Sequence, residues 1–124
     1  MSDHDSGFLG LIGAGDPTAT DGEARLEVEV DERHLNPAGT VHGGLLATLV
    51  DTTMGAAVRS MAEGEVPATS QLSVTYLRPG KPGPLEVTAA VRKRGESIVV
   101  CEADVTQEGK SLVHALATFA LIDG

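Results

Sequence analysis

The residues of this chain that are best suited to chemistry lie between Asn36 and Asp51. Asn36 brings an amide and His42 an imidazole, while Gly43 and Gly44 leave the backbone open to close approach. Asp51 falls inside an apolar stretch that reads as a helix, where Asp is unfavourable because its side chain competes for backbone hydrogen bonds. A bare backbone turn followed by one carboxylate could polarise a carbonyl group and activate a water molecule.

The start of this predicted helix is a candidate oxyanion site. Backbone N–H groups at a helix N-terminus lack intrahelical partners and lie at the positive end of the helix dipole. Gly43 opens the helix, and its missing side chain would let a substrate carbonyl reach the N–H group. Asp51 could then act as a general base toward water or attack the carbonyl directly, and the sequence leaves these alternatives open.

Helix geometry keeps these two groups apart. Gly43 and Asp51 are eight residues apart, so a single helix separates them by ~12 Å. A general base must lie within about 3 Å of the water that it activates, and an Asp side chain cannot cover the remaining gap. Gly43 of one subunit must therefore act with Asp51 of another, which predicts an obligate homodimer with two equivalent sites.

The surrounding pattern predicts one long helix and five strands. Residues 42–62 place apolar side chains on one broad stripe with the period of a helix. Residues 24–32 alternate apolar and charged side chains, as a half-exposed strand does. Four more strand-like segments follow: 67–77, 85–94, 97–107 and 110–122. Short connectors rich in Gly and Pro join these four, which predicts an antiparallel meander and an α+β domain.

The chain length of 124 residues favours a single domain, which we expect to comprise residues 24–124. Residues 1–23 are rich in Gly, Asp and Thr, and we expect this N-terminal segment to be partly mobile. Within it, residues 8–12 could form a short helix that docks on the core. Only three residues are aromatic, so the core lacks bulky anchors and further burial by oligomerisation is favoured.

The net charge of −9 argues against nucleic acid as a partner. An acidic N-terminus and the lack of an apolar run of ~20 residues predict a cytoplasmic protein that does not bind membranes. Five of the nine basic residues nevertheless lie within residues 78–94: Arg78, Lys81, Arg92, Lys93 and Arg94. They could bind phosphate groups, although ordinary charge at strand ends would explain the same pattern.

The spacing of the motif residues resembles that of hotdog-fold acyl-CoA thioesterases of the phenylacetate-degradation (PaaI-like) type. The motif reads Asn36-x2-Gly39-x2-His42-Gly43-Gly44-x6-Asp51-Thr52, and the resemblance covers residues 24–122. It implies a hotdog fold, in which an antiparallel sheet of about five strands wraps one central helix. It also implies hydrolysis of acyl-CoA to the free acid and CoA, without a metal or cofactor, by a homodimer or by a homotetramer built as a dimer of dimers.

The resemblance also implies which residues form the site. The implied catalytic residues are Asn36, His42, Gly43, Asp51 and Thr52, with Thr69 as a hydroxyl early in the next strand. The expected substrate-binding residues are Gly44, Ser70, Arg78, Arg92, Lys93 and Arg94. Plainer alternatives remain for several of them. Asn36 could simply close a turn, and His42 could cap the helix. Gly43 and Gly44 could merely permit a tight entry into the helix, and Asp51 taken alone could be a solvated helix residue.

Two other functions would be compatible with the same fold. A non-catalytic acyl-CoA-binding module would keep the groove and could lose the base, and the presence of Asn36 and Asp51 argues against it. A hydratase or dehydratase would use a His and an acid on a differently spaced loop, and the sequence contains no second match. Nothing in the sequence identifies the acyl group.

Overall fold

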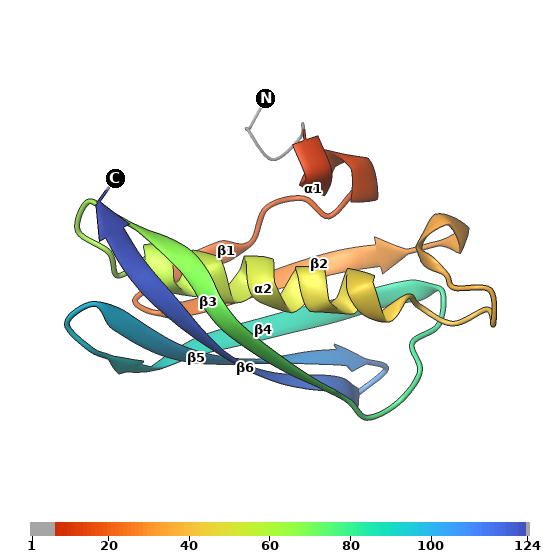
Figure 1. Cartoon of the computed structure of the whole chain (residues 1–124). Helices are drawn as coiled ribbons and strands as arrows, with labels where there is room; N and C mark the ends of the chain where they lie inside the picture. The colour runs from red at the N-terminus through yellow and green to blue at the C-terminus, as the bar shows by residue number, and fades with distance from the viewer. Residues whose placement is uncertain (1–6, 124) are drawn as a thin grey trace.

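The computed structural model describes residues 7–123, which form one antiparallel sheet with a long helix on one face (Figure 1). The elements are α1 (Gly7–Ile12), β1 (Thr18–Thr20), β2 (Glu23–Val30), the 3-10 helix η2 (Glu32–His34), α2 (Gly43–Arg59), β3 (Glu65–Tyr76), β4 (Gly83–Arg94), β5 (Ile98–Gln107) and β6 (Lys110–Asp123). The expected α+β hotdog fold is confirmed, with six strands because the short β1 pairs with β2.

The N-terminal segment contributes two elements to this fold. The short helix predicted at residues 8–12 is confirmed as α1, whose residues Leu9 and Ile12 pack against the core. The predicted mobility of residues 1–23 falls partly on residues 1–6, which lie outside the described residues. No helix within residues 7–123 is long and apolar enough to cross a membrane.

The strand order is β1-β2-β4-β5-β6-β3, and every neighbouring pair is antiparallel. Strands β4, β5 and β6 form the predicted meander. The prediction is wrong for β3, which pairs with β6 at the sheet edge instead of with β4. The connector 77–82 contains Pro79 and Pro82 and is longer than a tight hairpin turn. Hydrogen bonds from the Leu77 and Arg78 N–H groups to the Leu112 carbonyl hold this connector at the end of β6.

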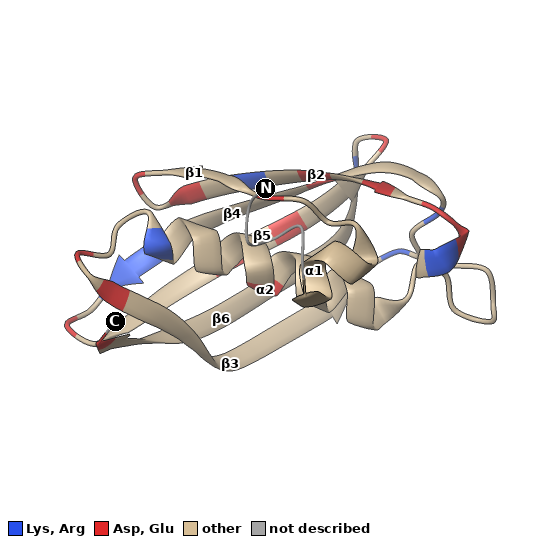
Figure 2. Cartoon of the chain, turned by 90° about the horizontal axis from the view of Figure 1, so that it is seen from above, with Lys and Arg blue, Asp and Glu red and all other residues tan. Residues whose placement is uncertain are grey.

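Helix α2 lies over the sheet between its two edges, one formed by β1 and the other by β3 (Figures 1 and 2). Its buried residues follow the predicted apolar stripe: Leu45, Leu46, Leu49, Val50, Thr53, Met54, Ala57 and Val58. The sheet covers only this side of α2. The opposite side includes Gly44, Thr48, Asp51 and Gly55. It meets the sheet at the β3 edge, where Thr69 is bonded to Asp51, and α1 lies above it (Figure 1).

Strand β3 forms an open edge of the sheet. None of its 12 residues is buried, because β6 pairs with one side only. The register shifts between Thr69 and Gln71, which marks a β-bulge. Bulges bend a strand and redirect its side chains. The sheet therefore ends beside α2 in a bent strand with unpaired backbone groups.

The single cysteine, Cys101, is buried in β5. Burial raises the pKa of its thiol to about 11, because the thiolate form would lose its hydration. The neutral thiol packs as a small apolar group in the core, as the sequence predicts.

Candidate active site

The N-terminus of α2 presents one free N–H group. The side chain of His42 caps the helix by accepting a hydrogen bond from the Gly44 N–H group, with 2.9 Å between Nδ1 and N. The carbonyl of His42 accepts from Leu45 and Leu46. Within residues 7–123, the N–H group of Gly43 makes no hydrogen bond. Among the described residues, Gly43 is thus the one position at the opening of the helix whose N–H group is left for a ligand, and its role as an oxyanion donor stays a prediction.

The imidazole and the backbone N–H group of His42 both make hydrogen bonds with the backbone around this turn. Since its Nδ1 accepts a hydrogen bond, the proton of the neutral ring lies on Nε2. The N–H group of His42 donates to the carbonyl of His34 at 2.8 Å. These contacts fit the capping alternative, in which His42 orients the helix start and takes no part in proton transfer.

Tyr76 explains why residue 43 is a glycine. The Tyr76 hydroxyl donates to the Gly43 carbonyl at 2.7 Å, and a Cβ atom at position 43 would lie only 3.3 Å from the Tyr76 ring. Tyr76 therefore holds the residue that carries the free N–H group. The motif does not include this tyrosine, although it is the only one in the sequence and is the last residue of β3.

Asn36 closes its own loop. Its Oδ1 accepts from the Ala38 and Thr40 N–H groups at 3.0 and 3.2 Å, and its Nδ2 donates to the Thr40 hydroxyl at 2.9 Å. Gly39 completes the turn with φ of 85°, a conformation that glycine adopts without strain. Both polar atoms of the amide are thus occupied within the loop that leads to His42, which fits the turn-closing alternative.

Asp51 and Thr69 form a second group, in the middle of α2. The Thr69 hydroxyl, placed by the β-bulge, donates to Asp51 Oδ1 at 2.6 Å. The other oxygen, Oδ2, has no hydrogen-bond partner within residues 7–123. Asp51 lines a pocket of about 240 Å³ together with Thr52. The Thr52 hydroxyl is also unpaired in the described part of the chain, whereas those of Thr48 and Thr53 donate to carbonyls of α2.

One chain does not bring the two halves of the site together. Gly43 lines a pocket with Tyr76 and Arg78, whereas Asp51 lines a different pocket. Both residues belong to the continuous helix α2, eight positions apart, which corresponds to ~12 Å along the axis. The carboxylate and the free N–H group therefore cannot act on one carbonyl from the same chain.

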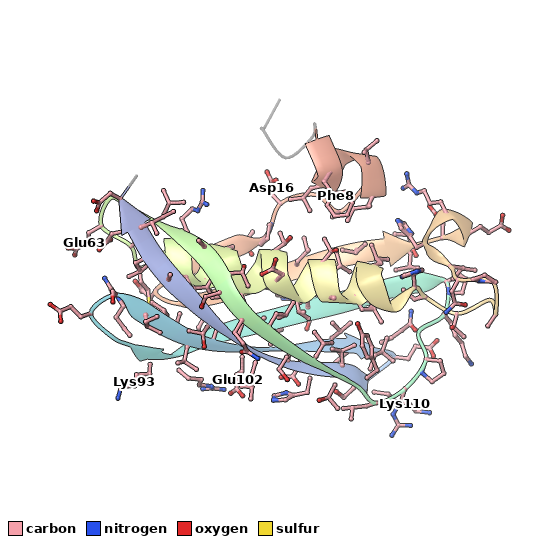
Figure 3. All side chains as sticks on the ribbon, viewed as in Figure 1. Phe8, Asp16, Glu63, Lys93, Glu102 and Lys110 are labelled. Carbon is pink, nitrogen blue, oxygen red and sulfur yellow. The ribbon has the colours of Figure 1, made fainter. Side chains whose placement is uncertain are left out.

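The basic residues within 78–94 lie at opposite ends of the molecule. The 12 residues of β4 span ~36 Å and separate Arg78 and Lys81 from the later bases. Arg78 and Lys81 lie with Lys110 at the Gly43 end, where they line a pocket of about 210 Å³. Figure 3 shows Lys110 and Lys93 at opposite ends of the sheet. The expectation of one local cluster is therefore wrong, because a strand runs between its members.

The bases at the far end of β4 are mostly paired. Arg92 forms an ion pair with Glu102, and Arg94 forms one with Glu65. The backbone N–H group of Glu63 donates to Glu65 and, with a smaller contribution from Arg94, holds the pKa of Glu65 below its ordinary value. Lys93 makes no ion pair with any described residue.

The remaining predicted site residue, Ser70, lies in the bulge of β3. Its hydroxyl donates to the Thr118 carbonyl at 3.0 Å, so it ties β3 to β6. Residues 7–123 contain no group of His, Cys, Asp and Glu side chains that could hold a metal ion.

Comparison with known proteins gives the family of the chain. Residues 38–114, which include Gly43, Asp51 and Thr69, match a model of the thioesterase superfamily. Human acyl-coenzyme A thioesterase 13 is 35% identical over 92 residues, which cover 73% of this chain and 66% of the human protein.

Two solved structures share the fold. A conserved protein of Pseudomonas aeruginosa has a TM-score of 0.89 at 31% identity, with 94% of both chains covered. A hypothetical thioesterase of Streptococcus pneumoniae, solved with coenzyme A, has a TM-score of 0.80 at 31% identity, with 86% of this chain and 83% of that chain covered.

The loop contacts of Asn36 predict the effect of two substitutions. Asn36→Ala removes three hydrogen bonds and should lower the free energy of unfolding by about 1–2 kcal/mol. Asn36→Asp keeps the Oδ1 acceptor and should lose less. Urea denaturation of the two variants measures this difference. An equal loss in both would mean that the two bonds to Oδ1 do not hold the loop.

Proposed function

Because this chain belongs to the thioesterase superfamily, we propose that it hydrolyses acyl-CoA thioesters to the free acid and CoA at a site shared by two subunits. The observation that carries the proposal is a free N–H group at Gly43 together with a carboxylate, Asp51, that has one unused oxygen. The names of two similar proteins, human acyl-coenzyme A thioesterase 13 and the streptococcal thioesterase solved with coenzyme A, support a CoA ester as substrate.

Gly43 polarises the thioester carbonyl. Its N–H group donates to the thioester carbonyl oxygen, whose negative charge grows as the carbonyl carbon becomes tetrahedral. The dipole of α2 adds to this stabilisation. His42 and Tyr76 hold the turn in place from its two sides, so the donor does not need to reorganise during the reaction.

Asp51 either activates the attacking water or attacks the carbonyl itself. As a general base, Oδ2 takes a proton from water while the water oxygen attacks the carbonyl carbon. The C–S bond then breaks, and the departing CoA thiolate takes up a proton. As a nucleophile, Asp51 itself attacks, releases the thiolate and forms a mixed anhydride that water hydrolyses. In both routes Thr69 fixes Oδ1, and the unpaired Thr52 hydroxyl can hold the water.

The open edge of β3 supports the two-subunit arrangement. A second copy can pair with this edge and continue the sheet, which would also protect the unpaired backbone groups. A two-fold axis beside β3 turns the exposed sides of the two α2 helices toward each other in antiparallel orientation. Gly43 of one chain then faces Asp51 of the partner subunit, which meets the distance requirement. We accordingly propose at least a homodimer.

A homotetramer and a cytoplasmic location also belong to this proposal. The outer face of the sheet carries exposed apolar side chains, among them Ile98, Leu116 and Ile122, that a second dimer could cover. The cytoplasmic location is supported by the sequence pattern alone.

The CoA nucleotide is best placed at the Gly43 end of each chain. Arg78 and Lys81 have no acidic partner in the described part of the chain and lie beyond Gly43. In an antiparallel pair, α2 of the partner subunit continues ~12 Å past Gly43, since Asp51 is eight residues before Arg59. Lys93 of the partner subunit therefore comes toward the same end. Phosphates could be bound by bases of both chains.

Removal of the carboxylate tests the chemical role of Asp51. Asp51→Asn preserves the shape of the side chain and should lower kcat by about 10²–10⁴-fold with little change in KM, because proton transfer occurs only in the transition state. Release of free thiol from acyl-CoA measures the rate. Glu29→Gln, on the exposed face of β2, serves as the matched control. A near wild-type kcat in the Asp51 variant would refute the assignment.

Mixed dimers test the shared site. A Gly43→Leu chain has no accessible oxyanion donor, and an Asp51→Ala chain has no base, so each homodimer should be inactive. In a mixed dimer, one site receives both defects and the other receives none, so up to half of the wild-type activity should return.

Chains with two different affinity tags allow the mixed dimers to be purified and assayed directly. Circular dichroism should first show that both single variants are folded, because leucine at position 43 must displace Tyr76. Folded mixed dimers without activity would rule out a site built from two chains.

Neutralisation of Arg78 and Lys81 tests the nucleotide site. The double variant Arg78→Gln/Lys81→Gln should raise KM for acyl-CoA about tenfold, since phosphate contacts are charge-assisted, and should leave KM for the matching pantetheine thioester unchanged. Arg25→Gln, whose side chain pairs with Glu27 and Glu86 on the sheet, is the control. An equal rise for both esters would assign these bases to general charge balance.

A further inference from the structure

Helix α1 lies against both halves of the site. Phe8 and Ile12 line a pocket of about 350 Å³ whose opposite wall includes Gly44 and Thr48 of α2. Leu9, on the same short helix, lines the pocket of the catalytic carboxylate. In Figure 3, Phe8 lies on the side of α1 that faces α2. The N-terminal segment thus lines both pockets, although the sequence motif implies no function for it.

The two sides of the Gly43 turn differ in chemistry. On the β3 side, Gly43 lines a pocket with Arg78, next to the free bases. On the α1 side, Gly44 lines the pocket that contains the apolar side chains of Phe8 and Leu45. Arg33 also lines this pocket, but its charge is paired with Asp31, whereas Arg78 has no acidic partner among the described residues. A thioester whose carbonyl is held at Gly43 extends in two directions, with CoA on one side and the acyl group on the other. The charged side fits the nucleotide, so the apolar side is left for the acyl group.

Besides the packing of Leu9 and Ile12 on the core, one buried histidine holds the end of α1. His34 is 5% exposed, and its Nε2 donates to the Ile12 carbonyl at 2.7 Å, while its Nδ1 accepts from the Asp31 N–H group at 3.0 Å. The carbonyl of His34 accepts from the N–H group of His42. A single residue therefore connects the end of α1 with the turn that carries the oxyanion donor. This connection fixes the position of the pocket wall relative to the Gly43 turn, where the substrate carbonyl is proposed to bind.

We propose that α1 is the specificity-determining wall of the acyl pocket, and that Phe8 and Ile12 contact an apolar acyl chain or aryl group. This inference rests on the proposed function. Phe8 is 61% exposed in the isolated chain, so its side chain is accessible to a ligand. Each methylene group buried in such a pocket should raise kcat/KM about fourfold. Acetyl-CoA, whose acyl group is too short to reach α1, should be a poor substrate.

The test compares Phe8→Ala and Ile12→Ala with a control on the same helix. Leu11 is 77% exposed and does not line the pocket, so Leu11→Ala removes the same kind of apolar surface outside the site. The substrates are saturated acyl-CoAs from acetyl to dodecanoyl, together with phenylacetyl-CoA. In the two pocket variants, kcat/KM for the best substrate should fall about tenfold while the value for acetyl-CoA stays within about twofold. Leu11→Ala should keep the wild-type profile.

Three outcomes would overturn the assignment. Equal changes for all substrates, or an effect of Leu11→Ala as large as that of Phe8→Ala, would show that α1 acts through general stability. A changed profile in Leu9→Ala alone would place the acyl group at the carboxylate pocket instead.

Binding separates this inference from the proposed function. Affinities of the same acyl-CoAs for the Asp51→Asn protein, measured by calorimetry, should increase with chain length and lose that dependence in Phe8→Ala. If this binding pattern is observed but the wild type does not hydrolyse acyl-CoA, the proposed function is refuted and the assignment of α1 to the acyl pocket is supported. If the wild type hydrolyses acyl-CoA but neither rate nor affinity depends on Phe8, the assignment of α1 to the acyl pocket is refuted and the proposed function is supported.

Discussion

The rise of 1.5 Å per residue along an α-helix is the constraint on which this structure depends. Helix α2 is continuous from Gly43 to Arg59, and its buried residues extend along one side from Leu45 to Val58. Its free N–H group at Gly43 and its carboxylate at Asp51 are therefore held at a distance that no side-chain rotation can remove. In the proposed mechanism each of these groups therefore acts with its counterpart from another chain. Small residues on the exposed side, such as Gly44 and Gly55, leave room for that second chain.

Strand β3 controls both half-sites at once. Tyr76, at its end, bonds to Gly43, and Thr69, at its bulge, bonds to Asp51. The same strand is the open edge at which a second copy could add. Strand β3 therefore carries both the side chains that bond to Gly43 and Asp51 and the edge proposed for association with a second chain. Formation of the dimer would place the partner directly beside the residues that orient the donor and the base.

Much of the polar motif serves the backbone. Asn36 closes the loop, His42 caps α2, and His34 satisfies the ends of η2 and α1. Backbone N–H and C=O groups in loops and at helix ends lack partners in regular secondary structure, and these side chains supply partners for them. Their effect on the site is to keep one N–H group, that of Gly43, unsatisfied in a rigid setting. A preorganised donor of this kind costs no reorganisation when charge develops on a substrate.

The sequence by itself determined the elements, the motif and the separation of Gly43 from Asp51, because helix period, strand alternation and turn residues are local properties of the chain. It also contained the argument for two subunits, since a helical distance follows from residue numbers alone. Only the tertiary structure decided that β3 pairs with β6 instead of β4. It also decided that a tyrosine 33 residues away covers Gly43. These features join segments that are distant along the chain, and strand pairing and side-chain contacts between such segments depend on which edges and faces are left free once the core has formed.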